Sequence, residues 1–150
     1  MSMKYNRQLP GPGELKEEYP LTPALAQLKA RRDEEIREVF AGNSQKFLVV
    51  VGPCSADRED AVLEYVSRLA KLQEQVQDKL LLIPRVYTNK PRTTGAGYKG
   101  MLHQPSPDKA PDLLGGIIAI RRLHLRVMEE SGLTAADEML YPENRSYLDD

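Results

Sequence analysis

Basic residues gather in the stretch from Lys79 to Pro107, which contains no Asp or Glu. The basic residues are Lys79, Arg85, Lys90, Arg92 and Lys99. Because the whole chain has a net charge of -1, this positive charge is local. Thr93, Thr94 and nearby glycines add hydroxyl groups and accessible backbone N–H groups. The combination predicts a site for anions, above all for phosphates.

Two further residues stand where an apolar run ends. Cys54 follows the apolar run Phe47 to Val51, after Gly52-Pro53. Arg85 directly follows the apolar run Leu80 to Pro84 and has no acidic residue nearby in sequence. A lone cysteine is more often a small buried hydrophobe than a ligand, but this position favours a functional role. Arg85 suits a bidentate phosphate or carboxylate contact about as well as an ordinary ion pair. Alternatively, Lys90, Arg92 and Lys99 are ordinary solvated charges on a surface loop.

The elements that must position these residues alternate along the chain. Residues 23–41 have a helical period between Thr22-Pro23 and Gly42, and the runs 47–51 and 80–87 are typical of buried strands. A second helix follows Asp57, a long loop spans 88–112, a third helix spans 113–131, and 135–140 is a possible third strand. This order predicts an α/β fold with a parallel sheet.

Because the carboxyl ends of parallel strands share one edge, we expect Cys54, Arg85 and the 88–100 loop to converge there. His124 is better explained by packing on its helix, and His103 lies in the loop without metal-ligand spacing. Asp57, Glu59 and Asp60 suit a helix N-terminus.

Composition excludes several classes of function. The near-neutral charge argues against a general nucleic-acid binder, and no apolar run is long enough to cross a membrane. No leader segment is recognised and the single cysteine fits a reducing compartment, so we expect a cytoplasmic protein. Motifs for P-loops, Rossmann dinucleotide sites and common zinc sites are absent from the sequence.

Several segments together carry a resemblance to a known family. They are Val50-Val51-Gly52-Pro53-Cys54-Ser55, Arg85-Val86-Tyr87, Lys90-Pro91-Arg92-Thr93-Thr94, Gly97-Tyr98-Lys99-Gly100 and the region from Ser131 to Ala136. In these the chain resembles the opening part of a type I 3-deoxy-D-arabino-heptulosonate 7-phosphate (DAHP) synthase. The glycine turn after Thr94 is one residue longer than in the best-known members of that family.

The resemblance implies a transferase of the shikimate pathway, which leads to chorismate and the aromatic amino acids. Its reaction is an aldol-type condensation of phosphoenolpyruvate with erythrose 4-phosphate. By the same resemblance Arg85 meets phosphoenolpyruvate, and Lys90 lies between the two substrates. Arg92 and Thr93 hold the phosphate of erythrose 4-phosphate, and Pro91 shapes the turn.

The family's cofactor is a divalent metal ion of the Mn, Fe, Co or Zn type. The resemblance makes Cys54 one of its ligands, with the other ligands lying outside this chain. It also implies a (β/α)8 TIM barrel, an architecture of about 250 residues, of which this chain would supply about the first three βα units. We therefore expect an arm over residues 1–20 and a partial barrel over residues 21–150, truncated and inactive alone.

Partners and alternatives follow from the same resemblance. A homo-oligomer and an aromatic amino-acid effector are expected from the family. One alternative is a non-catalytic binding or regulatory half-barrel that associates with a full-length synthase or mutase. Another is a related phosphoenolpyruvate-using synthase with a different aldose phosphate, against which Cys54 and Lys90-Pro91-Arg92-Thr93 argue.

Overall fold

The computed structural model describes residues 7–150, which form a mixed arrangement of helices and strands around a small parallel sheet. Strands β1 (Phe47–Val51) and β2 (Leu80–Pro84) pair in parallel, with Phe47 opposite Leu80 and Val51 opposite Pro84. The crossover between them is helix α3 (Glu59–Val76). Both predicted strands are therefore present, although β2 ends three residues before the predicted limit at 87.

Helix α2 (Pro23–Phe40) confirms the predicted outer helix. Thr22 is its N-cap, with Oγ1 accepting a hydrogen bond from the Leu25 N–H at 3.3 Å, and Pro23 takes the first position, where its missing N–H costs nothing. Gly42 follows the helix at φ +78°, a conformation that favours glycine. On its inner face the buried Arg32 donates to the Leu82 carbonyl at 2.8 Å, which ties α2 to β2.

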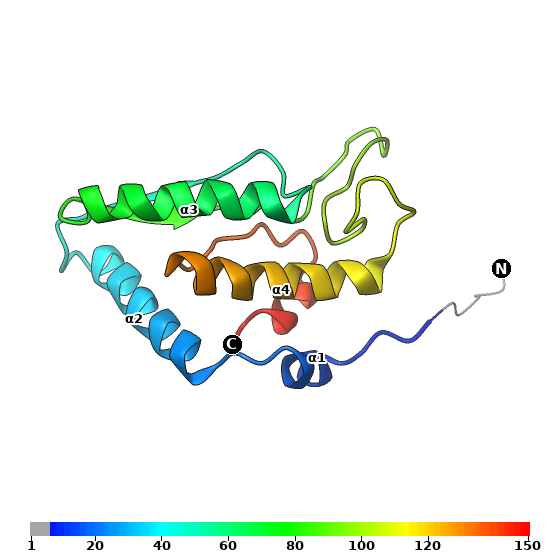
Figure 1. Cartoon of the computed structure of the whole chain (residues 1–150), viewed down its shortest axis with the longest axis horizontal. Helices are drawn as coiled ribbons and strands as arrows, with labels where there is room; N and C mark the ends of the chain where they lie inside the picture. Colours follow the sequence, from blue (N-terminus) through cyan, green and yellow to red (C-terminus); the bar gives the residue numbers. More distant parts are fainter. Residues whose placement is uncertain (1–6) are drawn as a thin grey trace.

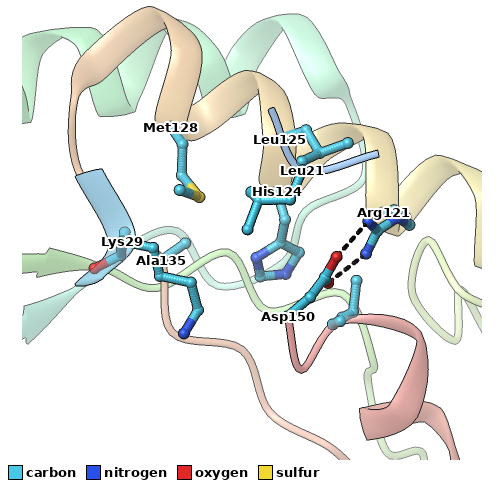
Figure 2. A pocket seen from close by; sticks show the side chains of 10 residues that line it. Leu21, Lys29, Arg121, His124, Leu125, Met128, Ala135 and Asp150 are labelled. Atoms are coloured by element: carbon cyan, nitrogen blue, oxygen red, sulfur yellow. Dashed lines mark hydrogen bonds and ion pairs between the residues drawn. The ribbon is translucent and has the colours of Figure 1, made fainter. Parts of the chain in front are cut away.

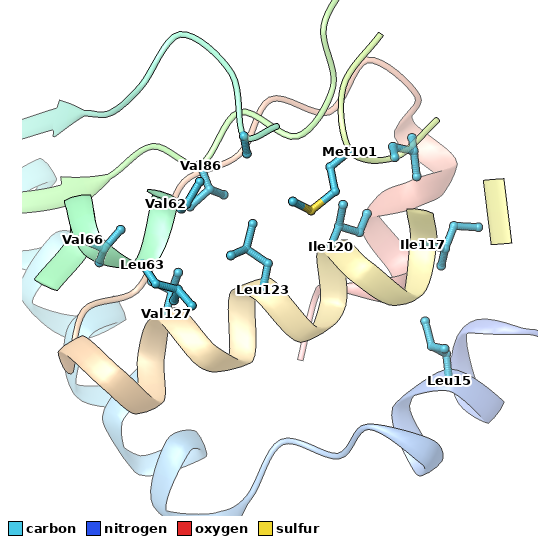
Figure 3. Packing of buried hydrophobic residues seen from close by; sticks show 12 residues of the cluster. Leu15, Val62, Leu63, Val66, Val86, Met101, Ile117, Ile120, Leu123 and Val127 are labelled. Atoms are coloured by element: carbon cyan, nitrogen blue, oxygen red, sulfur yellow. The ribbon is translucent and has the colours of Figure 1, made fainter. Parts of the chain in front are cut away.

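Helix α4 (Leu113–Ser131) begins at its Asp112 cap and ends at Gly132, which has left-handed φ +68°. Figure 1 shows α4 lying alongside α3, and the apolar faces of the two helices meet in the main core. Figure 3 shows the side chains of this core along α4, with Leu15 reaching it from the N-terminal segment. The buried members are Leu15, Ala56, Val62, Leu63, Val66, Val86, Met101, Leu102, Ile117, Ile120, Leu123 and Val127.

The sequence analysis missed one helix, α1 (Pro12–Glu18), inside the expected arm. The Pro-Gly cluster indicates an irregular segment, but Pro12 occupies the first helical turn and the Gly11 N–H donates to Glu14 Oε2 at 2.7 Å. Leu15 is fully buried against the chain's own core, so this part of the segment packs on its own molecule. Residues 1–6 of the expected arm lie outside the described residues.

Two further expectations need correction. Residues 135–140 form no strand: they contribute a single parallel bridge between Arg85 and Ala136, with Val86 N–H bonded to the Ala136 carbonyl at 2.9 Å. Asp57 does not cap α3, because Arg58 occupies the N-cap position and no side chain bonds there. The predicted acidic first turn is present in Glu59 and Asp60. The chain ends in the 3₁₀ helix η1 (Pro142–Tyr147).

Candidate functional site

Cys54 stands in the turn that follows β1, where its side chain is exposed. The chain reaches this turn through Gly52, whose backbone lies directly against the Arg85 carbonyl. A Cβ at Gly52 would lie 1.9 Å from that oxygen, so no other residue fits without moving one of the two strands. The glycine thus allows the ends of β1 and β2 to approach closely enough to bring Cys54 beside Arg85.

Arg85 lies directly after β2 and turns toward the same edge of the sheet. Its guanidinium donates to the Pro53 carbonyl at 2.9 Å, and Cζ lies 4.7 Å from the centre of the Tyr87 ring. The Arg85 N–H continues the ladder to the Val51 carbonyl at 2.9 Å. The side chain is therefore held by a carbonyl and an aromatic face, with no carboxylate partner among the ion pairs of the described residues.

Lys90 closes the group from the following loop. Its Nζ lies 2.8 Å from Cys54 Sγ and 2.9 Å from the Cys54 carbonyl oxygen, and 5.5 Å from the centre of the Tyr87 ring. The hydrogen bond and charge of Lys90, joined by the charges of Arg85 and Arg92, lower the pKa of the Cys54 thiol. The site therefore favours a thiolate, the form of cysteine that binds metals and reacts as a nucleophile.

Tyr87 connects the two cations and is not among the predicted site residues. It is the one non-glycine among the described residues with positive φ, at +33°. Such a conformation is costly for a bulky aromatic residue and persists only where its surroundings impose it. No sequence signal marks this strain, because the run Leu80 to Tyr87 looks like a continuous strand.

The loop after Lys90 carries the remaining predicted anion-binding residues. Pro91, Arg92 and Thr93 are exposed, and Arg92 Nε donates to the Tyr98 carbonyl at 2.7 Å. Tyr98 in turn donates its hydroxyl to the Ala56 carbonyl at 3.4 Å, and burial together with Asp57 raises the pKa of Tyr98 to about 12. The loop is thus attached to the turn that carries Cys54, and Arg92 stays near enough to lower the pKa of the Cys54 thiol.

The structure therefore brings together Cys54, Arg85 and Lys90, with Arg92 close enough to affect the thiol. His103 instead packs edge-on against Tyr141, with ring centres 5.6 Å apart, and burial and Lys99 lower its pKa. His124 lies 3.3 Å from Asp137 Oδ2 on the face of α4 that borders a separate pocket (Figure 2). Neither histidine is placed beside Cys54 by any contact of the described residues.

A metal ion finds one suitable donor at this edge. An exposed cysteine whose pKa is lowered suits a transition metal or zinc. Within residues 7–150, no group of three or more His, Cys, Asp and Glu side chains is arranged to hold a metal ion. The same part of the chain contains no helix with the length and hydropathy needed to span a membrane.

Comparison with known proteins identifies the family of this chain. The sequence model of the DAHP synthetase I family matches residues 22–150. The chain belongs to this family. It is 37% identical over its whole length to the Phe-sensitive phospho-2-dehydro-3-deoxyheptonate aldolase of Escherichia coli K12. It is also 37% identical, over 93% of the chain, to the Tyr-sensitive enzyme of the same organism.

The three-dimensional comparison gives the same family. The solved phospho-2-dehydro-3-deoxyheptonate aldolase of Francisella tularensis SCHU S4 superposes with a TM-score of 0.88 at 29% identity. That superposition covers 97% of this chain and 42% of the solved one. The chain likewise spans 42% of the Phe-sensitive Escherichia coli relative, so it corresponds to an N-terminal portion of a family member.

Proposed function

We propose that this chain supplies one part of the active site of a DAHP synthase, which condenses phosphoenolpyruvate with erythrose 4-phosphate, consumes one water and releases inorganic phosphate. The observation that carries the proposal is the contact between Lys90 Nζ and Cys54 Sγ at 2.8 Å, beside Arg85, in a member of this family. In the whole protein the two-stranded sheet and the segment at Ala136 begin a (β/α)8 barrel.

Each cation takes a role that suits its position. Arg85, fixed by the Pro53 carbonyl, binds phosphoenolpyruvate through its planar guanidinium, which suits phosphate and carboxylate groups. Lys90 carries a proton that it donates toward the aldehyde oxygen of erythrose 4-phosphate as the new C–C bond forms. Arg92 and Thr93, both exposed on the loop, bind the phosphate of that sugar, and Pro91 shapes the turn between them and Lys90.

Cys54 serves as one ligand of a divalent metal ion in this proposal. The lowered pKa of its thiol fits that role, since metals bind the thiolate. When bound, the metal supplies Lewis-acid polarisation of the aldehyde. In this proposal the other ligands come from elsewhere in the whole protein. Among residues 7–150 no group of three or more His, Cys, Asp and Glu side chains is arranged to hold a metal ion.

Regulation and assembly belong to the same proposal. The two Escherichia coli relatives are named as Phe-sensitive and Tyr-sensitive enzymes. We extend this to an aromatic amino-acid effector for the present protein, acting on a homo-oligomer. Its reaction would lie in the cytoplasmic shikimate pathway.

The test is a chimera in which this chain replaces the matching N-terminal part of the Phe-sensitive Escherichia coli enzyme. Phosphate release is measured with both substrates and Mn²⁺, and with each substrate alone. We expect turnover only with both substrates, and a loss of at least about 100-fold in kcat for Lys90→Met, because a positioned proton donor contributes about that much. The matched control is Lys71→Met, which removes an exposed lysine on α3.

Two outcomes would contradict the proposal. One is a folded chimera that turns over phosphoenolpyruvate only with a different aldose phosphate. The other is a Lys90→Met chimera as active as the Lys71→Met control. A third outcome would instead favour a regulatory module. In that outcome the chimera has no turnover, and the 150-residue chain by itself binds a full-length synthase tightly.

A further inference from the structure

A buried carboxylate holds the backbone just before Lys90. The side chain of Asp137 is only 2% exposed. Its Oδ1 accepts the Thr88 N–H at 2.8 Å, and its Oδ2 accepts the Thr88 hydroxyl and lies 3.3 Å from His124 Nε2. Burial opposes ionisation, but the hydrogen bonds from His124 and Thr88 lower the pKa of Asp137 overall. Asp137 therefore acts as an ionised acceptor with both oxygens occupied.

Thr88 is held from the other side as well. It is fully buried, and its carbonyl accepts the Leu102 N–H at 3.2 Å. Gly100, at φ +97°, lies so close that a Cβ there would be 2.2 Å from the Thr88 oxygen. Thr88 is thus fixed by its amide, hydroxyl and carbonyl, immediately after the strained residue Tyr87.

The position of this anchor connects it with the site. Tyr87 turns the chain at positive φ, so its ring lies beside both Arg85 and Lys90. Such a turn relaxes unless neighbouring contacts oppose it. The contacts that oppose it are the Ala56 N–H bond to the Tyr87 carbonyl at 3.1 Å and the contacts of Thr88. The strongest of these are to Asp137, because hydrogen bonds to a charged acceptor exceed neutral ones.

We propose that Asp137 is a positioning residue that fixes Lys90 against Cys54 by holding Thr88 and the strained turn at Tyr87. His124 orients the carboxylate from α4 and completes the arrangement. Asp137 itself has no contact with Cys54, Arg85 or Lys90 among the hydrogen bonds of the described residues, so it acts through the backbone. The catalytic use of Lys90 rests on the proposed function, whereas its placement against Cys54 does not.

The single cysteine provides a direct reporter of this placement. Alkylation by iodoacetamide modifies only Cys54, and its rate at pH 7 depends on the nearby ammonium of Lys90. We expect Lys90→Met and Asp137→Ala each to slow alkylation by about threefold or more, because both remove the ammonium from the sulfur. No substrate or metal is present, so failure here is distinct from failure of the proposed activity.

A double-mutant cycle separates positioning from general loosening of the fold. If Asp137 acts through Lys90, adding Asp137→Ala to Lys90→Met changes the rate by less than about 1.5-fold. The structural control is Val127→Ala, which removes a buried methyl pair on α4 and should leave the alkylation rate within about 1.5-fold of wild type.

Conservative changes complete the test. Asp137→Asn should keep a near wild-type rate, because its oxygen can still accept the Thr88 N–H while its amide donates to the hydroxyl. Thr88→Val loses only the hydroxyl contact and should slow alkylation less than Asp137→Ala. If Asp137→Ala does not fold, Thr88→Val carries the cycle with Lys90→Met. A wild-type alkylation rate in folded Asp137→Ala, or a slowing by Asp137→Ala that persists fully in the Lys90→Met background, would overturn the proposal.

Discussion

At the scale of single residues, the chemistry depends on a sulfur and an ammonium in contact. Lys90 Nζ at 2.8 Å stabilises the Cys54 thiolate, and Arg85 and Arg92 act in the same direction. These cations have a second consequence, because a cluster without a carboxylate partner attracts anions. The same side chains therefore suit both a metal-binding thiolate and phosphorylated substrates.

Asp137 allows a prediction about pH. Because the pKa of Asp137 is lowered in the folded chain, its stabilising contribution is complete above about pH 3.9, the pKa of an unfolded Asp, and is lost as pH falls through the folded value. At pH 7 we expect the free energy of unfolding of Asp137→Asn to be about 1–2 kcal/mol lower than that of wild type, because hydrogen bonds to a charged acceptor become neutral ones. Urea unfolding should show this difference shrinking on acidification below pH 4. A constant difference down to pH 2 would contradict the assignment.

The sequence allowed part of the site to be predicted at this scale. Cys54 and Arg85 each follow an apolar run, and the parallel order of the strands puts both at one edge. Tyr87 and Asp137 could not be found in the same way. The residue after Tyr87, Thr88, is held by Gly100, Leu102 and Asp137, which all lie farther along the chain, and Asp137 lies beyond α4.

At the scale of elements, α4 depends on a glycine in its interior. Gly116 packs against the loop at Leu102, where a Cβ would lie only 1.7 Å from the backbone oxygen. Helix propensity alone would predict that alanine stabilises this position by about 1 kcal/mol. The close approach of the loop reverses that expectation.

We therefore predict that Gly116→Ala destabilises the chain by about 1–3 kcal/mol, the usual cost of overpacking. Gly13→Ala is the matched control, because Gly13 lies in α1 with nothing within 4 Å of the added Cβ. It should be neutral or stabilising by up to about 1 kcal/mol. Thermal or urea unfolding of both variants measures the difference. Equal stability of the two would show that the loop does not press on α4.

The helices show what patterns in a sequence can and cannot determine. Thr22-Pro23 and Gly42 carry local start and stop signals, and α2 begins and ends where these predict. Residues 135–140, expected as a possible third strand, form only the bridge at Ala136. Strand formation needs a paired neighbour, which composition does not supply. Helix α1 likewise depends on the burial of Leu15 in a distant core.

At the scale of the whole molecule, one arginine joins the segments that are far apart in sequence. Arg121 on α4 is 2% exposed and donates to the carbonyls of Tyr19 and Tyr147 at 2.8 and 2.9 Å. It also makes a two-pronged ion pair with Asp150, visible in Figure 2, which lowers the pKa of that carboxyl group. Because 30% of the Asp150 side chain is exposed, solvent weakens this ion pair, and the pair defines one arrangement of the chain more than it adds net stability.

The sheet also bears on the proposed whole protein. β1 leaves Phe47 and Val50 exposed, at 72% and 49%, and Phe40 at the end of α2 is 81% exposed. Side chains of a strand project from the faces of the sheet, and exposed apolar groups there are usually covered by further structure. In the proposed barrel further elements would cover these side chains and bring the missing metal ligands to the Cys54 rim. The 42% coverage of the relatives is consistent with that proposal.

The most direct measurement of the central claim is the pH dependence of Cys54 alkylation in wild type and in Lys90→Met. The alkylation rate increases with pH as the thiol ionises. Because Lys90 lowers the pKa of the thiol, this increase should begin at a lower pH in wild type than in Lys90→Met, which lacks the ammonium. The control Lys71→Met, which removes an exposed lysine on α3, should leave the pH profile unchanged. Superimposable profiles for wild type and Lys90→Met would contradict the account, because the sulfur and the ammonium would then not meet.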